Sequence, residues 1–298
     1  MTESQYLTAI YAFNYFGPAR TKLLLSYFKS AKNIWKSSTF ELKEIGLSEK
    51  KVLEFDKFRK DFEIEKYFQR LAKLQVKVVT ILDKTFPKNL KDLPGAPLVL
   101  YYKGSIECLN TNSVAVVGTR KITAYGREVA QKFSSELASF GVTIISGLAY
   151  GVDTEAHKAC LSVHGKTVAV LGNGLETVYP LENTALASEI VKTGGAVISE
   201  FPLNYPLLPA NFAIRNRIVS GLSDAVVVIE GAEKSGTLLT ATHAAEQGKT
   251  VLAVPGQITS PLSWAPLFLL KNGAKMVTET KDILEELDLQ VKVDKDKI

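Results

Sequence analysis

The chain has 298 residues, of which 46% are hydrophobic and 22% charged, so it is long enough to form one substantial globular core and a small companion domain. Lysine and arginine exceed the acidic residues by five, which permits a polyanionic partner without requiring one. Cys108 and Cys160 are too few for a disulfide framework or a four-cysteine zinc site, and we expect reduced thiols.

The first twenty residues lack the basic start and the unbroken apolar core of a signal peptide. No run of residues approaches the roughly 18 apolar positions that a membrane span requires. The sequence therefore predicts a cytoplasmic protein without a membrane partner.

Residues 1–70 show apolar side chains at helical spacing and predict a small all-α domain. Gly17 and Pro18 separate two helical runs, and the segment Ile45–Lys50 forms a second break. This arrangement is typical of a helix-hairpin-helix or SAM-like element, whose backbone N–H groups approach nucleic-acid phosphates. An ordinary turn of a helical bundle explains the same pattern.

Residues 75–105 change character. The β-branched run Val76–Leu82 and the segment Leu98–Gly104 flank a proline-bounded loop. We interpret them as two short strands that extend the main sheet.

From Ser113 onward, buried strands and helical runs alternate regularly, as in an α/β fold with a doubly wound parallel sheet. We therefore divide the chain into a helical domain (1–70), a sheet domain (71–290) and a disordered tail (291–298). The expected strands are Val114–Val117, Val142–Ile145, Thr167–Leu171, Ala196–Ser199, Ala225–Ile229, Thr250–Val254 and Lys275–Val277.

Glycines, serines and charged residues follow the expected strands. Because the carboxyl ends of parallel strands share one edge of a sheet, these turns should cluster there and expose backbone N–H groups to phosphates. The candidate phosphate-binding residues in these turns are Gly118, Arg120, Ser146, Gly147, Gly151, Gly172, Gly174, Ser235 and Gly236.

A further candidate lies between the fourth and fifth of these strands, where Arg215, Asn216 and Arg217 stand together ahead of an apolar helix. Guanidinium groups suit phosphate clamping because their planar fork meets two oxygens at once. Pairing with the acidic Glu200 is the structural alternative. We expect one arginine to be structural and the other to bind phosphate.

Several enzyme classes are disfavoured by spacing alone. Gly118 is followed by Thr119 and Arg120, and Gly172 and Gly174 lead to Thr177, so neither turn matches the dinucleotide fingerprint. A Walker A motif is absent from the sequence, and we expect no cofactor.

The three histidines, His157, His164 and His243, stand apart from cysteines and carboxylate clusters, so we expect no metal site. No Ser/His/Asp constellation stands out, and we predict a binding protein without catalytic residues.

The motifs together resemble the DNA-processing protein A family, also called Smf or DprA. They follow the family's order from the N-terminal helices to about Leu287. The motifs are VGTRKITAYG, SGLAYGVDTEAH, TVAVLGNGLETVYPLEN, ISEFP, RNRIVSGLSDAVVVIE, SGTLLTA and VLAVPG.

The resemblance implies a SAM-like domain on an extended Rossmann domain. It implies binding and protection of single-stranded DNA without catalysis, loading of a RecA-type recombinase during natural transformation, and homodimers through the Rossmann domain. Gly118, Arg120, Ser146, Gly147, Gly151, Arg215–Arg217, Ser235 and Gly236 match family motif positions.

The sequence also departs from the family pattern. Lys249 stands where an arginine is common, which keeps the charge but loses bidentate geometry. Ala265 and Leu267 stand where the family tends to have glycine and asparagine, and Ala213 replaces a common proline. The departures at Ala265 and Leu267 bear on any contact from the Pro261–Ala274 segment, whereas the change at Ala213 is small.

The alternative function is enzymatic. The Rossmann portion is similar to nucleoside-monophosphate phosphoribohydrolases of the LOG type, whose signature PGGxGTxxE carries the reacting glutamate. Here Leu239 and Thr240 follow the matching Gly-Thr pair, and no carboxylate comes after them. We also note Tyr125, Tyr150, Tyr179 and Phe201 near the turns as candidates for base stacking.

Overall fold

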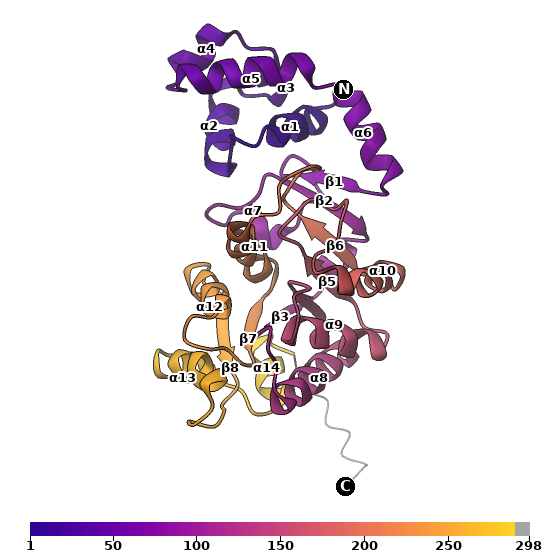
Figure 1. The fold of residues 1–298 in the computed structure, drawn as a ribbon, viewed down its shortest axis with the longest axis vertical. Coiled ribbons are helices and arrows are strands. Elements are labelled where there is room, and N and C mark those ends of the chain that lie inside the picture. The colour runs from indigo at the N-terminus through magenta and orange to yellow at the C-terminus, as the bar shows by residue number, and fades with distance from the viewer. Residues whose placement is uncertain (290–298) are drawn as a thin grey trace.

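The computed structural model describes residues 1–289 and shows an α/β fold built on a nine-stranded sheet (Figure 1). Its strand order is β1-β2-β6-β5-β4-β3-β7-β8-β9. The strands are β1 (Lys77–Thr80), β2 (Val99–Gly104), β3 (Ser113–Val117), β4 (Thr143–Ser146), β5 (Thr167–Val170), β6 (Ala196–Ser199), β7 (Ala225–Val228), β8 (Thr250–Ala253) and β9 (Lys275–Met276).

Strand β3 lies between two halves of the sheet. The chain builds β4, β5 and β6 outward on one side, then crosses back to place β7, β8 and β9 on the other. All pairs from β6 to β9 are parallel, whereas β1 and β2 join in antiparallel fashion beside β6. The direction of winding reverses at β3, and the adjoining carboxyl edge is where an open α/β sheet binds its ligands.

Helices cover both faces of this sheet. Alternate residues of β3 face opposite layers, since Ala115 packs toward α11 and α12, and Val116 packs toward α8 and α9. Both faces of the strand are therefore buried, which explains its unbroken apolar sequence. These helices are α7 (Lys88–Lys91), α8 (Ala124–Ser139), α9 (Val152–Ser162), α10 (Thr184–Lys192), α11 (Pro209–Leu222), α12 (Gly236–Glu246), α13 (Trp264–Lys271) and α14 (Thr280–Glu286).

Six helices form the N-terminal region and lie at the β1–β2 end of the elongated molecule (Figure 1). Their apolar side chains share one core with the sheet, because Tyr6 and Leu7 belong to the same buried cluster as Val99, Tyr101 and Val197. The six helices are α1 (Glu3–Ala12), α2 (Pro18–Phe28), α3 (Ala31–Lys36), α4 (Thr39–Glu44), α5 (Glu49–Asp61) and α6 (Ile64–Lys73).

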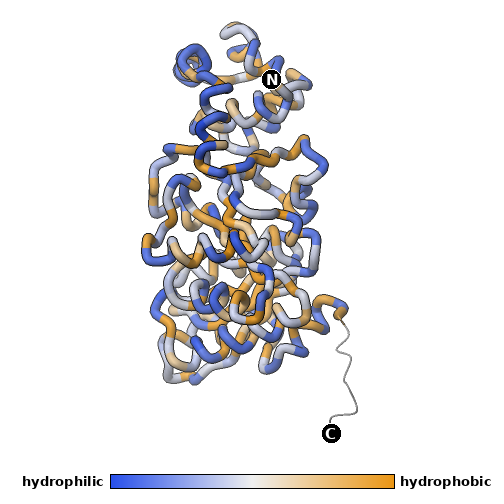
Figure 2. Tube along the Cα trace, turned by 90° about the vertical axis from the view of Figure 1, so that its right-hand side faces the viewer, coloured by the Kyte–Doolittle hydropathy of each residue, from blue (hydrophilic) through white to orange (hydrophobic). Residues whose placement is uncertain are grey.

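The hydropathy of the chain follows this architecture. Hydrophobic stretches run through the body of the sheet region, and hydrophilic segments are frequent at its surface and around the N-terminal helices (Figure 2). Within residues 1–289, none of the helices combines the length and apolarity needed to cross a bilayer. The tail expected at 291–298 lies outside the described residues.

The predicted α/β fold and its helical N-terminal region are confirmed, and every expected strand is present with ends shifted by at most a few residues. One local expectation is wrong. Arg215, Asn216 and Arg217 do not precede a helix but lie inside α11, which already begins at Pro209. Proline is favourable in the first helical turn because an N–H there would have no partner within the helix, and no further proline interrupts α11 before it ends at Leu222.

Candidate nucleic-acid interface

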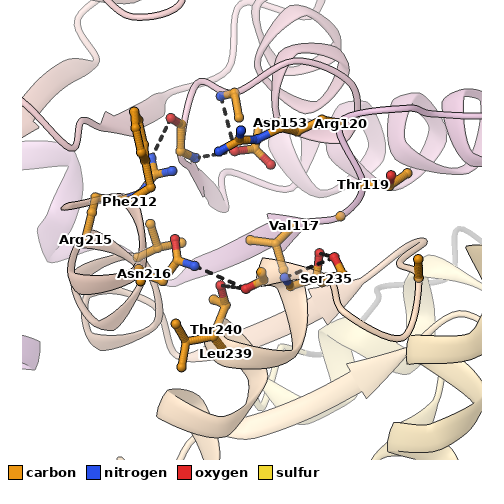
Figure 3. A pocket seen from close by; sticks show the side chains of 18 of the residues that line it. Val117, Thr119, Arg120, Asp153, Phe212, Arg215, Asn216, Ser235, Leu239 and Thr240 are labelled. Atoms are coloured by element: carbon orange, nitrogen blue, oxygen red, sulfur yellow. Dashed lines mark hydrogen bonds between the residues drawn. The ribbon is translucent and has the colours of Figure 1, made fainter. Parts of the chain in front are cut away.

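A cavity of about 490 Å³ lies at the edge of the sheet where its winding reverses (Figure 3). The turns after β3, β4 and β7 and one side of α11 form its walls. Its lining residues are Val117, Gly118, Thr119, Arg120, Gly147, Ala149, Asp153, Pro209, Phe212, Ala213, Arg215, Asn216, Val219, Ala232, Ser235, Gly236, Thr237, Leu239 and Thr240.

Gly118 allows the turn after β3 to lie against α9. A Cβ atom at this position would collide with the side chain of Val152. The adjoining backbone is fixed from both sides, because the Thr119 N–H donates to the Glu230 carbonyl over 2.8 Å and the Thr119 carbonyl accepts from the Val152 N–H over 3.2 Å. The turn therefore presents the next residue, Arg120, from a rigid base.

Arg120 is exposed at the mouth of the cavity. Its guanidinium carbon lies 5.5 Å from the centroid of the Phe212 ring, a cation–π arrangement that leaves the donor groups free for another partner. No carboxylate of residues 1–289 forms an ion pair with it. Its charge is available to an anion.

Arg215 has a different environment, because its side chain is buried beneath the cavity. Its Nη1 donates to the carbonyls of Gly147 and Val170, at the ends of β4 and β5. Burial lowers the pKa of Arg215 to about 10, although the carboxylate of Asp153 raises it and Arg120 lowers it further. The guanidinium remains charged at neutral pH and joins α11 to two strand ends.

Asp153 holds the turn after β4. One oxygen of its carboxylate accepts the Gly147 N–H over 3.0 Å and the Ala149 N–H over 3.3 Å. Burial raises the pKa of Asp153, whereas Arg215 and these N–H groups lower it. The carboxylate therefore organises the turn from inside the protein.

Successive side chains on α11 point in different directions because each residue turns the helix by about 100°. Asn216 reaches the N-terminus of α12, where its amide donates to the Gly236 carbonyl over 3.2 Å. Arg217 instead pairs with the buried carboxylate of Glu200, which also lies 3.5 Å from the Tyr11 hydroxyl. Burial raises the pKa of Glu200, and Arg217 opposes this shift.

The N-terminus of α12 borders the cavity opposite Arg120 (Figure 3). Ser235 caps this helix by accepting the Thr237 N–H over 3.2 Å. Gly236 is exposed, and a Cβ atom there would meet nothing within 4 Å. The free amides and positive dipole of a helix start favour an anion at this wall.

The structure brings seven of the predicted site residues to this cavity, and an eighth, Gly151, to an adjoining groove. Five others line neither space. Ser146 is buried and donates to the Val116 carbonyl over 2.7 Å. Gly172 and Gly174 are buried beside Phe212 and Pro202.

The remaining two are Arg217 and Lys249. Arg217 pairs with Glu200, and the buried Arg215 bonds two backbone carbonyls, so both arginines of the motif make structural contacts and the expected division between them is not seen. Lys249 immediately precedes β8 and therefore lies at the opposite edge of the parallel sheet from the cavity. Because Lys249 comes before its strand and not after it, the sequence alone already indicates the amino edge of the sheet.

Phe212 is the main cavity residue that the sequence analysis missed. Its ring contacts Arg120 and lies 5.5 Å from the ring of Tyr179. A turn-centred search overlooks it because it belongs to a helix. The signal available was its spacing of three residues before Arg215, which places both on one side of α11.

The predicted stacking candidates differ in exposure. Tyr150 and Tyr179 are exposed and line a small hollow beside Arg120, whereas Tyr125 donates its hydroxyl to the Pro255 carbonyl over 2.7 Å. Phe201 is buried against Tyr205, with ring centroids 4.6 Å apart. Phe201 is therefore not available to a base.

Histidine and cysteine side chains occupy structural positions. His157 is buried with its Nδ1 2.7 Å from the Thr167 hydroxyl, and burial with the nearby Arg215 lowers its pKa to about 3. Burial raises the pKa of Cys108 to about 11 and of Cys160 to about 12, so both remain thiols at neutral pH. Across residues 1–289 we find no group of three or more potential metal-ligating side chains.

The cavity thus combines a free guanidinium, a helix N-terminus and hydroxyl groups with apolar walls from Phe212 and Leu239. The cation and helix start suit a phosphate, and the apolar walls suit a base or sugar. The lining carboxylate, Asp153, is buried and bound to backbone N–H groups, so it is poorly placed to attack or to transfer a proton. This chemistry favours binding a nucleotide unit over breaking its bonds.

Comparison with known sequences identifies a family and several relatives. A family model described as DNA recombination-mediator protein A matches residues 77–288. Protein Smf of Escherichia coli is 50% identical over 196 residues, which cover 66% of this chain and 52% of that protein. The DNA processing protein DprA of Bacillus subtilis is 38% identical over 233 residues, covering 76% of this chain and 78% of that protein. The chain thus spans about half the length of the Escherichia coli relative.

Two solved structures are also similar. DNA processing protein A from Streptococcus pneumoniae superposes with a TM-score of 0.83 and 33% identity, covering 96% of this chain and 99% of that chain. The protein of the same name from Helicobacter pylori, described with its single-stranded DNA binding mode, gives a TM-score of 0.65 and 28% identity. That match covers 72% of this chain and 98% of that chain.

Proposed function

Because the chain belongs to the DNA recombination-mediator protein A family, we propose that it binds single-stranded DNA at the cavity around Arg120 and does not cleave it. The Helicobacter pylori relative is described with a single-stranded DNA binding mode, which supports this choice of ligand. The proposal extends to protecting incoming DNA in natural transformation and recombination.

The observation that carries the proposal is the position of Arg120. This exposed cation has no carboxylate partner among the described residues, and it stacks on Phe212 at the mouth of a cavity walled by a helix N-terminus. A phosphate meets the cation and the helix start, while an adjoining base meets the aromatic ring. These contacts read backbone and ring faces, so we expect little sequence preference.

A salt titration tests this proposal. Fluorescence anisotropy of a labelled 20-nucleotide dT strand should show tight binding. The logarithm of the association constant should fall linearly with the logarithm of the salt concentration, with a slope of about −0.7 for each neutralised phosphate. No binding, or a flat response to salt, would refute it. Incubation with AMP should release no adenine, and release would establish the phosphoribohydrolase alternative instead.

We propose that the bound strand is passed to a RecA-type recombinase. The family description as a recombination mediator supports this role. The test is the rate at which a RecA-type recombinase assembles on DNA coated with single-strand binding protein. Addition of this protein should shorten the lag, and an unchanged lag would argue against a mediator role.

We propose further that the protein forms homodimers through its sheet domain. An apolar patch on α13 supports this, since the stacked rings of Trp264 and Phe268 are partly exposed beside Ile258, which is 89% exposed. Leu267, which departs from the family pattern, lines one hollow together with these three side chains, whereas Ala265 is buried. Exposed apolar side chains that gather around one hollow are suited to burial in a protein interface.

Sedimentation analysis tests the dimer. The wild-type protein should sediment as a dimer, and Phe268→Arg should shift it to monomer while thermal unfolding stays near the wild-type temperature. A monomeric wild-type protein, or a Phe268→Arg variant that still dimerises, would remove α13 from the proposed interface.

A further inference from the structure

A second basic hollow adjoins the cavity. This groove, of about 560 Å³, is lined by α9, by the start of α8 and by the turns after β3 and β4. Arg120 lines the cavity, the groove and the small hollow beside Tyr179, and Tyr150 lines the groove and this hollow. The three spaces therefore adjoin one another at Arg120.

Two lysines supply the free positive charge of the groove. Lys121 and Lys158 are exposed, and neither forms an ion pair with any residue between 1 and 289. The third cation, Arg127, lies 3.1 Å from the carboxylate of Glu155, which also accepts the Gln131 amide over 2.7 Å. Arg127 is thus largely neutralised, and the two lysines remain available to an anion.

Glu182 lines the same groove and carries the charge opposite to that of these lysines. Its exposed carboxylate accepts a hydrogen bond of 2.6 Å from the Tyr150 hydroxyl, so the two side chains bridge the turn after β4 and the segment before α10. This contact lies where the small hollow meets the groove, because Tyr150 lines both. An anionic strand in the groove would therefore lie near this carboxylate.

We infer that bound DNA continues from the cavity past Arg120 into this groove, where Lys121 and Lys158 receive backbone phosphates and Glu182 opposes the strand. The inference rests on the proposed binding of single-stranded DNA. Several cations spread over adjoining spaces match a phosphodiester backbone better than they match one isolated phosphate. Glu182 acts as a negative determinant that weakens binding through like-charge repulsion.

The two roles predict changes of opposite sign. Lys158→Ala should weaken binding of a 20-nucleotide dT strand about threefold to tenfold and reduce the magnitude of the salt slope by about 0.7, because one phosphate contact is lost. Glu182→Gln should strengthen binding roughly twofold to fivefold, as expected for removal of one exposed like charge. Neither change should alter competition by a dT trinucleotide, which is short enough to occupy the cavity alone.

Two substitutions on α10 serve as controls of matched chemistry. Lys192→Ala and Glu189→Gln remove the same charges from exposed positions that line none of the three spaces. Their affinities should equal that of the wild type, and thermal unfolding of all four variants should remain unchanged.

The outcomes separate the groove from the cavity. If the wild type binds DNA but the groove variants behave like the α10 controls, or change affinity in the same direction, the groove is not part of the strand path. If trinucleotide competition changes as much as binding of the long strand, the lysine acts in the cavity and the groove assignment is wrong. If the wild type binds no DNA, both the groove and the proposed function fall.

Discussion

Arg215 on α11 donates a hydrogen bond from its Nη1 to the carbonyl of Gly147, in the turn after β4. The same side chain bonds the Val170 carbonyl at the end of β5. One buried cation therefore joins a helix to two strand ends and supports the floor below Arg120. This arrangement makes the glycine at 147 a structural requirement.

Gly147→Ala should destabilise the protein. The added Cβ would collide with the Arg215 guanidinium, so the guanidinium must leave its buried hydrogen bonds or the turn must move. Overpacking of this kind costs about 1–3 kcal/mol of unfolding free energy, measurable by urea denaturation. Gly236→Ala is the matched control, because nothing lies within 4 Å of its added Cβ, and it should change stability by less than about 0.5 kcal/mol. Equal effects of the two changes would contradict the role assigned to Arg215.

Arg120→Ala should weaken binding of single-stranded DNA at least tenfold without altering thermal unfolding. The side chain is exposed and its removal leaves no buried group unpaired. The affinity of Arg120→Lys should fall between those of the wild type and Arg120→Ala, since lysine keeps the charge and loses the planar fork that stacks on Phe212. Binding is measured by anisotropy at fixed salt. A variant that unfolds yet retains affinity in its folded fraction would make Arg120 a structural residue.

Arg217→Ala should show the opposite pattern. It leaves the Glu200 carboxylate buried without its cation, a loss that typically costs about 3–5 kcal/mol. DNA affinity of the folded protein should change little, because Arg217 does not line the cavity. Chemical denaturation and anisotropy on the same preparation distinguish the two effects. Strongly reduced affinity with unchanged stability would place Arg217 at the DNA.

Protonation of His157 should contribute to acid sensitivity. Burial lowers its folded-state pKa to about 3, against an ordinary value of 6.5, so the unfolded chain binds a proton that the folded protein does not. Stability from this residue is complete above about pH 6.5 and is lost as pH falls toward 3, with a loss of roughly 2 kcal/mol at pH 5.

Replacement of the imidazole tests this sign. His157→Gln should flatten the dependence of unfolding free energy on pH between 6.5 and 4, although its stability at pH 7 is lower. His164→Gln, at an exposed position, is the control and should retain the wild-type slope. An unchanged slope in His157→Gln would assign the acid sensitivity to other groups. Asp153 and Glu200 are not among them, because their raised pKa values add stability as the pH falls.

The sequence predicts the strands well because buried parallel strands are short apolar runs closed by glycine or serine. Gly118 and Arg120 follow such a run directly, so their place at the carboxyl edge is readable from local pattern. The order of the strands is not, since pairing depends on contacts between residues far apart in the chain. That order is what places the turn after β7 beside the turn after β3.

The directions of the side chains on α11 limit how much of the candidate site can be predicted from the sequence. Three adjacent residues at 215–217 look like one cluster in the sequence, yet the helix sends them to the strand ends, to α12 and to Glu200. Phe212 belongs to the same helix and reaches the cavity because it lies three residues before Arg215, on the same side of the helix. Once the start of the helix at Pro209 is known, these directions follow from its geometry, but sequence motifs alone do not supply that start.

Photo-crosslinking measures the position of the strand most directly. A dT strand that contains 5-iododeoxyuridine is bound to the protein and irradiated, and it then forms covalent crosslinks to aromatic side chains that touch its bases. Mass spectrometry identifies the crosslinked peptide. Phe212 and Tyr179, with rings 5.5 Å apart beside Arg120, should carry the crosslinks. Crosslinks confined to Trp264 on α13 or to Tyr27 on α2, with none at Phe212 or Tyr179, would contradict binding at this edge of the sheet.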